Sequence, residues 1–220
     1  MIYIKPTNKI RKFFIFTRDL MQPSFTFVKN MKLRIGILGG TFHPPHAGHV
    51  FISSDAIERF NLDYVFWIVS LKNPLKIEEP PPIYDRIETC KRIIDNENII
   101  VSNLAAEINS NKTIDIVNFL LNNYGQSEYY WMMGSDNLVK FDEWNQWKEL
   151  LDKIKIIVYD RPGYLYEDIK QKLNQNVVQH KVGVEAFLES SAPCWTLVKA
   201  GPPNVSSTEI RKNNNGNETK

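Results

Sequence analysis

The sequence predicts a single α/β domain built on a doubly wound parallel sheet. From Leu33 onwards, short apolar runs alternate with longer segments of helical periodicity. With 220 residues, 43% of them hydrophobic and 24% charged, the chain is long enough for one well-buried core. Strands that alternate with helices are joined by right-handed crossovers and lie parallel, so ligands are expected at their carboxyl ends.

Each predicted strand is a short apolar run, and each predicted helix is a longer amphipathic segment. The strands begin with Arg34 to Leu38 and continue at 64–69, 99–101, 129–133, 154–159 and 195–198. The helices lie at about 47–60, 83–95, 113–124 and 164–173. This regular alternation is the order that a doubly wound sheet requires.

Both ends of the chain depart from this pattern. Residues 1–30 hold six Lys or Arg and one Asp; they are basic and acid-poor like a targeting peptide, but lack its apolar stretch and its cleavage site. We expect residues 1–31 to be a poorly ordered extension or a mis-called start, because Met21 and Met31 both precede the first strand. The folded domain is expected over residues 32–213, and residues 214–220 form a polar tail.

Charge and cysteine content exclude several classes of function. Residues 31–220 carry 21 basic and 24 acidic side chains, which argues against a nucleic-acid-binding surface. No run approaches the ~18 apolar residues of a membrane span. Cys90 and Cys194 are too few for a disulfide framework and are expected to be core residues in a reducing cytoplasm. We therefore expect a cytoplasmic protein without nucleic-acid or membrane partners; a homo-oligomer is left open.

The segment Gly39-Gly-Thr-Phe-His-Pro-Pro-His-Ala-Gly-His49, directly after the first strand, predicts a phosphate site. Its paired glycines let the backbone turn tightly and approach a ligand closely, and its prolines lead into a helix. His46 and His49 share one face of that helix, at the end that attracts anions. An imidazole donates to phosphate and, when protonated, opposes charge on a leaving pyrophosphate. A zinc pair or two core histidines are the alternatives, although no third ligand cluster accompanies them.

A second segment, Val205-Ser-Ser-Thr-Glu-Ile-Arg211, predicts another helix N-terminus, because Ser206 and Glu209 match a capping box. Its amides and hydroxyls suit the β and γ phosphates of ATP, and Arg211 adds a fixed positive fork. An ordinary capped helix is the alternative.

Together the two segments resemble the adenylyltransferase superfamily that shares H-x-G-H, and most closely its nicotinate mononucleotide adenylyltransferases, which carry I-S-S-T-x-[IV]-R in the second position. His46 and His49 match the paired histidines of that family. His43 stands where the family often has an acidic residue or Asn, so it receives only a supporting role. Aminoacyl-tRNA synthetases share the first motif but carry a lysine-rich loop in place of the second.

Weaker resemblances lie in the right order between the two motifs. Met133 to Asn137 resembles the family's M-G-A-D-N, which implies a ribose contact for Asp136, with an Asx turn as the alternative. Trp144 resembles the aromatic residue that stacks on the pyridine, with a core position as the alternative. The resemblance also implies mononucleotide contacts for Lys76 or Lys72, for Thr113 and for Arg161; a surface lysine and a helix cap remain the alternatives for the first two.

The resemblance thus implies a Rossmann-like nucleotidyltransferase that transfers AMP from ATP to nicotinate mononucleotide, giving deamido-NAD and pyrophosphate. The implied catalytic residues are His46, His49 and Arg211. The implied ATP-binding residues are Gly39, Gly40, Thr41, Phe42, Gly134, Asp136, Ser206, Ser207 and Thr208. The implied mononucleotide-binding residues are Lys76, Thr113, Trp144 and Arg161.

Mg²⁺ is expected to be bound with ATP rather than by the protein, because the sequence offers no carboxylate cluster. Three alternatives remain open: nicotinamide mononucleotide as acceptor, phosphopantetheine as acceptor, and a regulator that binds nucleotides without turnover.

Overall fold

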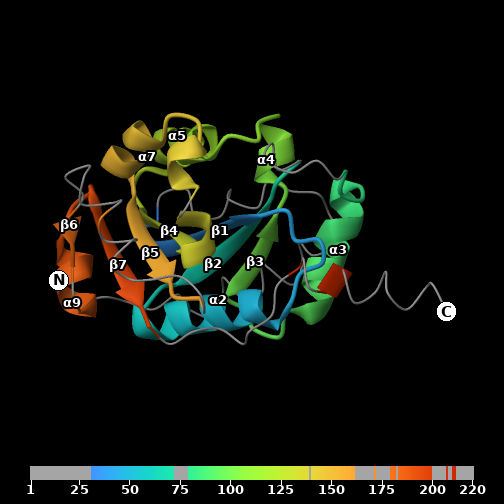
Figure 1. Cartoon of the computed structure of the whole chain (residues 1–220), viewed down its shortest axis with the longest axis horizontal. Coiled ribbons are helices and arrows are strands. Elements are labelled where there is room, and N and C mark those ends of the chain that lie inside the picture. Colours follow the sequence, from blue (N-terminus) through green and yellow to red (C-terminus); the bar gives the residue numbers. More distant parts are fainter. Residues whose placement is uncertain are drawn as a thin grey trace.

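The computed structural model describes residues 31–71, 79–138, 140–161, 171, 179–181, 183–199, 207, 210 and 211. Within them it confirms the predicted doubly wound sheet, whose strands run in the order β3-β2-β1-β4-β5-β7-β6 with every pairing parallel (Figure 1). Several predictions fall outside the described residues: the extension 1–30, the helix 164–173, the tail 214–220, and the side chains of Lys72, Lys76, Ser206 and Thr208.

The order of the strands creates a switch point between β1 and β4. The strands are β1 (Arg34–Gly40), β2 (Tyr64–Val69), β3 (Ile99–Ser102), β4 (Glu128–Gly134), β5 (Lys155–Tyr159), β6 (Gln179–His180) and β7 (Cys194–Val198). The chain moves outward from β1 to β3 and then returns to the other side of β1 at β4. Loops that leave the carboxyl ends of β1 and β4 therefore diverge, and the crevice between them is where such folds bind ligands.

The longer helices match the sequence prediction, and the shorter ones were missed. The helices are α2 (Ala47–Arg59), α3 (Ile83–Ile93), α4 (Leu104–Glu107), α5 (Thr113–Tyr124), α6 (Ser135–Leu138), η3 (Phe141–Glu143), α7 (Trp147–Lys153) and α9 (Val184–Glu189). The predicted helices 47–60, 83–95 and 113–124 correspond to α2, α3 and α5. The prediction missed β6 and helices of seven residues or fewer, because so short a segment shows no period.

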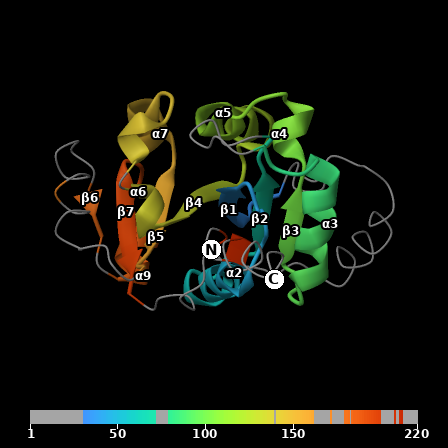
Figure 2. The same cartoon turned by 45° about the vertical axis from the view of Figure 1, so that its right-hand side comes forward.

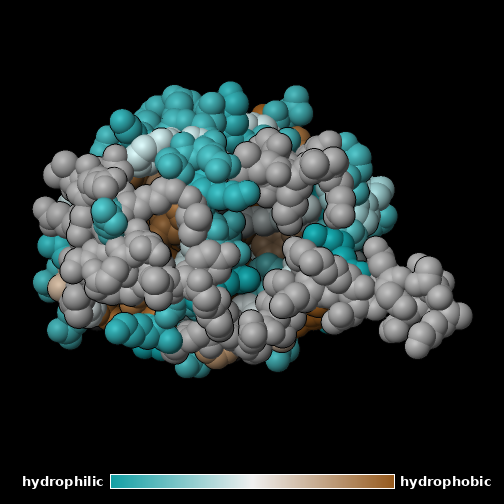
Figure 3. Space-filling view, viewed as in Figure 1, coloured by the Kyte–Doolittle hydropathy of each residue, from teal (hydrophilic) through white to brown (hydrophobic). Residues whose placement is uncertain are grey.

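The sheet separates two hydrophobic cores, because successive strand side chains point to opposite faces. Ile37 and Trp131 belong to the core covered by α4, α5 and α7, whereas Leu38 and Trp67 belong to the core covered by α2, α3 and α9. Figure 2 shows α5 and α7 on one side of the sheet and α2 on the other. The outer surface over α5 and α7 is hydrophilic (Figure 3), as expected for helices whose inner faces pack on a sheet.

Three predictions about the body of the domain can be compared directly with the structure. Cys90 and Cys194 are buried core residues, as predicted. Met31 packs against the core and its carbonyl accepts a hydrogen bond from Ser127 Oγ at 2.8 Å, so it belongs with the domain rather than with the extension. In the part of the chain that is described, no helix combines the length and the apolar character needed to cross a bilayer.

Candidate active site

The chain turns after β1 at Phe42 and not at the paired glycines. Gly39 and Gly40 are the last residues of β1, and Phe42 has a φ of 49° in the left-handed region. A Cβ atom at Gly39 would lie 2.7 Å from the indole ring of Trp131, and one at Gly40 would lie 3.2 Å from the ring of Phe42. Close packing on Trp131 therefore excludes a larger residue at Gly39, and packing on Phe42 is tight at Gly40. The turn itself lies at Phe42, which corrects the expectation that the glycines make it.

The ring of Phe42 packs between Trp67 and His49. Its side chain is 3% exposed and stacks on Trp67, with ring centroids 4.9 Å apart at an interplanar angle of 9°. Its ring centroid also lies 4.9 Å from that of His49. Phe42 was expected at ATP, but its ring packs on Trp67 and His49 and does not face the site.

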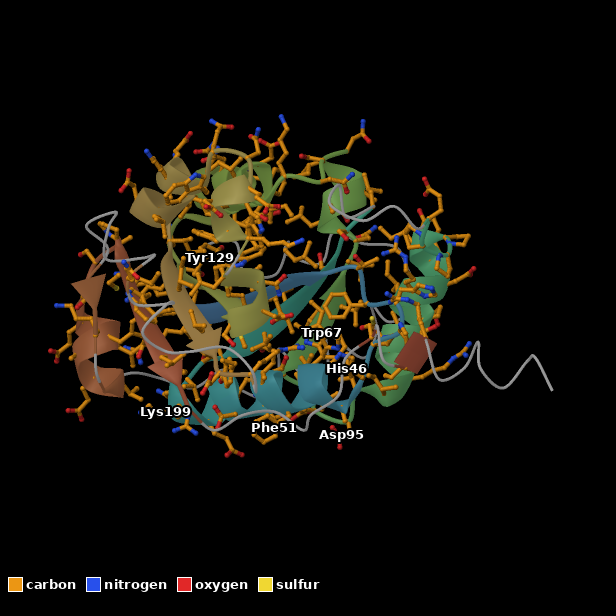
Figure 4. All side chains as sticks on the ribbon, viewed as in Figure 1. His46, Phe51, Trp67, Asp95, Tyr129 and Lys199 are labelled. Carbon is orange, nitrogen blue, oxygen red and sulfur yellow. The ribbon has the colours of Figure 1, made fainter. Side chains whose placement is uncertain are left out.

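The two histidines meet at the start of α2; Figure 4 labels His46 there. His46 is the N-cap residue, its backbone N–H donates to His49 Nδ1 at 3.2 Å, and the ring centroids lie 3.8 Å apart. Pro44 and Pro45 directly precede the cap and lead into the helix, as expected from the sequence. The predicted pairing of the histidines at a helix N-terminus is confirmed.

Both imidazoles are neutral at neutral pH in the protein without substrate. The pKa of His46 falls to about 4, chiefly because of burial and also because of the positive charge of Arg161, whereas Asp136 acts in the opposite direction. The pKa of His49 falls to about 3, because of burial and then of its proximity to His46 and Arg161. Since His49 Nδ1 accepts a hydrogen bond, the proton of the neutral ring is assigned to Nε2. Protonation therefore has to await an anion.

A charged pair lies at the neighbouring strand ends. Arg161 Nε is 3.2 Å from Asp136 Oδ1, and the backbone N–H of Arg161 donates to Ser135 Oγ at 2.9 Å. A Cβ atom at Gly134 would lie 2.3 Å from Asp136 Oδ1 and 2.7 Å from Arg161 Nε, so only glycine leaves room for this pair. Because both charges influence His46, the structure brings four of the predicted site residues together: His46, Gly134, Asp136 and Arg161.

The second predicted motif lies against the first. Ser207 Oγ donates to the carbonyl of Pro44 at 2.8 Å, across a sequence separation of 163 residues. Arg211 Nη1 donates to the carbonyl of His43. His43 thus takes part through its main chain, and Arg211 is held within the loop that carries the histidines.

Thr113 and Trp144 belong to the opposite face of the sheet from the histidines. Thr113 is the first residue of α5; the N-cap is Lys112, so Thr113 is not the capping residue. Trp144 is half-buried, with ring centroids 6.0 Å from Trp131 and 5.2 Å from Phe141. Much of its ring therefore packs on the core, the alternative that the sequence left open.

Some supporting residues have no motif in the sequence. Trp67 Nε1 donates to Ser53 Oγ at 2.8 Å, and Ser53 Oγ donates to the carbonyl of His49 at 2.8 Å, so two buried side chains fix the first turns of α2. Arg86 is a buried guanidinium beneath the loop after β1. From the sequence, these residues resemble ordinary positions of an amphipathic helix or a buried strand, and only the contacts reveal their roles.

Comparison with known proteins agrees with this geometry. A family model described as cytidylyltransferase-like matches residues 37–213. The probable nicotinate-nucleotide adenylyltransferase of Ruegeria sp. (strain TM1040) is 33% identical over 183 residues, which cover 82% of this chain and 97% of that protein. The protein of the same name from Pelagibacter ubique (strain HTCC1062) is 35% identical over 182 residues, which cover 82% and 93% of the two chains.

A solved structure has the same fold. The Plasmodium falciparum nicotinic acid mononucleotide adenylyltransferase complexed with NaAD superposes with a TM-score of 0.63 at 18% identity, over 82% of this chain and 83% of that chain. The family model covers most of the chain, and the curated relatives match it over nearly their whole length. This chain is therefore a member of the cytidylyltransferase-like family and belongs to its nicotinate-nucleotide adenylyltransferases.

Proposed function

We propose that this chain transfers the adenylyl group of ATP to nicotinate mononucleotide, forming deamido-NAD and pyrophosphate. The observation that carries the proposal is the meeting of the two motifs: Ser207 and Arg211 bond to the loop that presents His46 and His49. Relatives that match this chain over most of their length are named probable nicotinate-nucleotide adenylyltransferases. The curated names and the site chemistry thus point to one activity.

In the proposed reaction, a phosphate oxygen of the mononucleotide attacks the α phosphorus of ATP. The bond from that phosphorus to the bridging β oxygen breaks, and pyrophosphate leaves with the electron pair. The attacking phosphate is already ionised, so no base is needed, and the protein acts through alignment and charge stabilisation. No covalent enzyme intermediate is required.

Negative charge grows on the pyrophosphate as it leaves, and the proposed role of the histidines is to stabilise it. Neutral His46 and His49 donate hydrogen bonds, and the approaching anion raises the pKa of each ring and favours proton uptake. Arg211 supplies a permanent charge from the second motif. Burial, with a smaller contribution from Arg161, keeps both rings neutral until the anion arrives.

The remaining contacts are proposed from the resemblance to the family. The main chain of the loop 39–42 and the residues Gly134, Asp136, Ser206, Ser207 and Thr208 are assigned to ATP. Lys76, Thr113, Trp144 and Arg161 are assigned to the mononucleotide. For Asp136 the ribose contact has to coexist with its pairing to Arg161, which leaves its second carboxylate oxygen for a hydroxyl.

Mg²⁺ is proposed to enter as part of the MgATP substrate. The described residues contain no group of three or more His, Cys, Asp or Glu side chains able to hold a metal ion, so phosphates and water would supply its ligands. Two free, buried thiols suit the reducing cytoplasm that we propose as its location.

The test is pyrophosphate release by the full chain with MgATP and one of three acceptors: nicotinate mononucleotide, nicotinamide mononucleotide or phosphopantetheine. We expect the highest kcat/KM with nicotinate mononucleotide. Activity with only one of the other acceptors would keep the chemistry and overturn the substrate. Binding of ATP without pyrophosphate release from any acceptor would instead identify a nucleotide-binding regulator.

A further inference from the structure

Arg86 of α3 is buried beneath the site and bonds to carbonyl groups only. Its side chain is 3% exposed. Nε donates to the carbonyl of Pro81 at 2.8 Å, and Nη2 donates to that of Leu71 at 3.0 Å. Nη1 donates to two carbonyls at once, that of Thr41 at 2.8 Å and that of Ser70 at 2.7 Å. One guanidinium therefore joins the loop after β1, the end of β2 and the segment before α3.

The charge of Arg86 has no carboxylate partner among the described residues. Burial lowers the pKa of its guanidinium, and Cys90 is the neighbour that acts in the opposite direction. An arginine nevertheless stays protonated under these conditions. Burying a charge is costly unless hydrogen bonds compensate it, and here four carbonyl oxygens do so. A positive charge thus lies under the end of the sheet where two phosphate-bearing substrates would meet.

The carbonyls that Arg86 binds determine where the adjoining N–H groups point. In a trans peptide the C=O and the following N–H point in opposite directions. Since the Thr41 carbonyl is turned towards Arg86, the N–H of Phe42 is turned away from it. The same holds for the Ser70 carbonyl and the N–H of Leu71. Within the described part of the chain, neither N–H donates to another backbone group.

We propose that Arg86 is a positioning residue that orients the N–H groups of Phe42 and Leu71 as donors to substrate phosphate. It acts through the Thr41 and Ser70 carbonyls, which share its Nη1 atom. One loop follows β1, whose end carries the ATP phosphate motif, and the other follows β2, so Arg86 also fixes the spacing between the two. This inference rests on the proposed function in one respect, the identity of the phosphates. The hydrogen bonds of Arg86 do not depend on it.

The test uses Arg86→Lys and Arg86→Met, with Arg92→Met as the matched control, since Arg92 is exposed on the same helix. Lysine keeps the charge but cannot join three segments through a planar fork. Methionine keeps much of the volume and removes both the charge and the donors. Isothermal titration with MgATP alone gives Kd and the number of sites separately, and thermal unfolding gives the folded fraction.

We expect the Kd for MgATP to rise about tenfold or more in both Arg86 variants, because misdirected donors weaken phosphate binding. The number of sites should stay near one per chain, and Arg92→Met should match the wild type. A merely structural role would lower the number of sites or the melting temperature and leave the Kd of the folded fraction unchanged, which would overturn the proposal. If Arg86→Met does not fold, the Kd and the number of sites measured for Arg86→Lys alone decide between the two roles.

This design separates the two proposals. A wild-type protein that binds MgATP but releases no pyrophosphate with any acceptor refutes the proposed reaction and leaves the comparison of Kd values intact. A wild-type protein that is active, together with Arg86→Lys of unchanged Kd, refutes the role of Arg86 and leaves the reaction intact.

Discussion

The loop after β1 and the ends of β4 and β5 form two parts of one site, yet different forces hold them. On the β1 side, Phe42 packs on Trp67, a hydrogen bond joins uncharged groups of His46 and His49, and the guanidinium groups of Arg86 and Arg211 donate to backbone carbonyls of the loop. On the β4 side, Arg161 and Asp136 form an ion pair at 3.2 Å above Gly134. The β4 side thus carries an ion pair of two side chains, whereas the two histidines on the β1 side are neutral donors that can titrate.

This difference indicates how the site manages charge. A cation that is always present would attract both phosphate substrates, but it also keeps a nearby imidazole neutral. Neutral donors bind phosphate without repelling Arg161, and they can gain a proton once the anion is present. We infer that charge on the histidine side follows charge on the substrate, which suits a reaction in which negative charge develops on pyrophosphate.

Replacing either histidine should have the largest effect on activity. We expect His46→Ala and His49→Ala each to lower kcat by about 10² to 10³, by analogy with the loss of other charge-stabilising donors. The measurement is the initial rate of pyrophosphate release at saturating substrates, with Arg92→Met as a surface control. Near wild-type activity with an intact fold would show that the histidines do not stabilise the transition state.

Acid should lower the stability of the folded chain through the protonation of His46 and His49. In the unfolded chain both rings titrate near 6.5, whereas the folded pKa values are about 4 for His46 and about 3 for His49. Below pH 6.5 the unfolded state therefore binds more protons, so stability is fully present above that pH and is lost as the pH falls towards 4. At pH 5 the loss should be on the order of 1 to 2 kcal/mol per histidine.

Urea unfolding at pH 7.5 and at pH 5 measures this loss. The double variant His46→Asn, His49→Asn should show a smaller difference between the two pH values, because it lacks both titrating groups. An equal difference in the variant and the wild type would assign the acid sensitivity to other groups.

A larger residue at Gly134 should displace the ion pair of Asp136 and Arg161. In Gly134→Ala the new methyl group would meet Asp136 Oδ1 at 2.3 Å and Arg161 Nε at 2.7 Å, so the ion pair has to shift. We expect kcat/KM to fall about tenfold, since small displacements of charged groups at a site are costly. Steady-state kinetics measures this, and an unchanged kcat/KM would mean that the pair is not used by either substrate.

The smallest effect is expected for the support behind the histidines. Ser53→Ala removes the acceptor of the buried Trp67 Nε1 and the donor to the part-buried His49 carbonyl. We expect a loss of about 1 to 3 kcal/mol in the free energy of unfolding, as for other buried groups left without a partner. Denaturant unfolding at neutral pH tests this, and Ser54→Ala on the same helix is the control. Equal stability of the two variants would contradict the role of Ser53.

Much of the framework was predictable because its signals are local. Strand and helix periods placed β1 to β5, β7 and the long helices to within two residues, and the spacing of His46 and His49 predicted their pairing at a helix N-terminus. The short helices α4, α6 and α9 were not predicted, because four to six residues are too few to show a helical period. For Phe42, the sequence indicated an ATP contact but gave no sign that its ring turns inward.

The sequence by itself determined the fold class and the two phosphate motifs, because periodicity and motif spacing are properties of neighbouring residues. Only the tertiary structure decided how the motifs combine. It placed Ser207 on Pro44 across 163 residues of chain, lowered the pKa of both histidines by burial, and gave Arg86 its four carbonyl partners. These features depend on contacts and desolvation between distant segments, which exist only once the sheet has assembled.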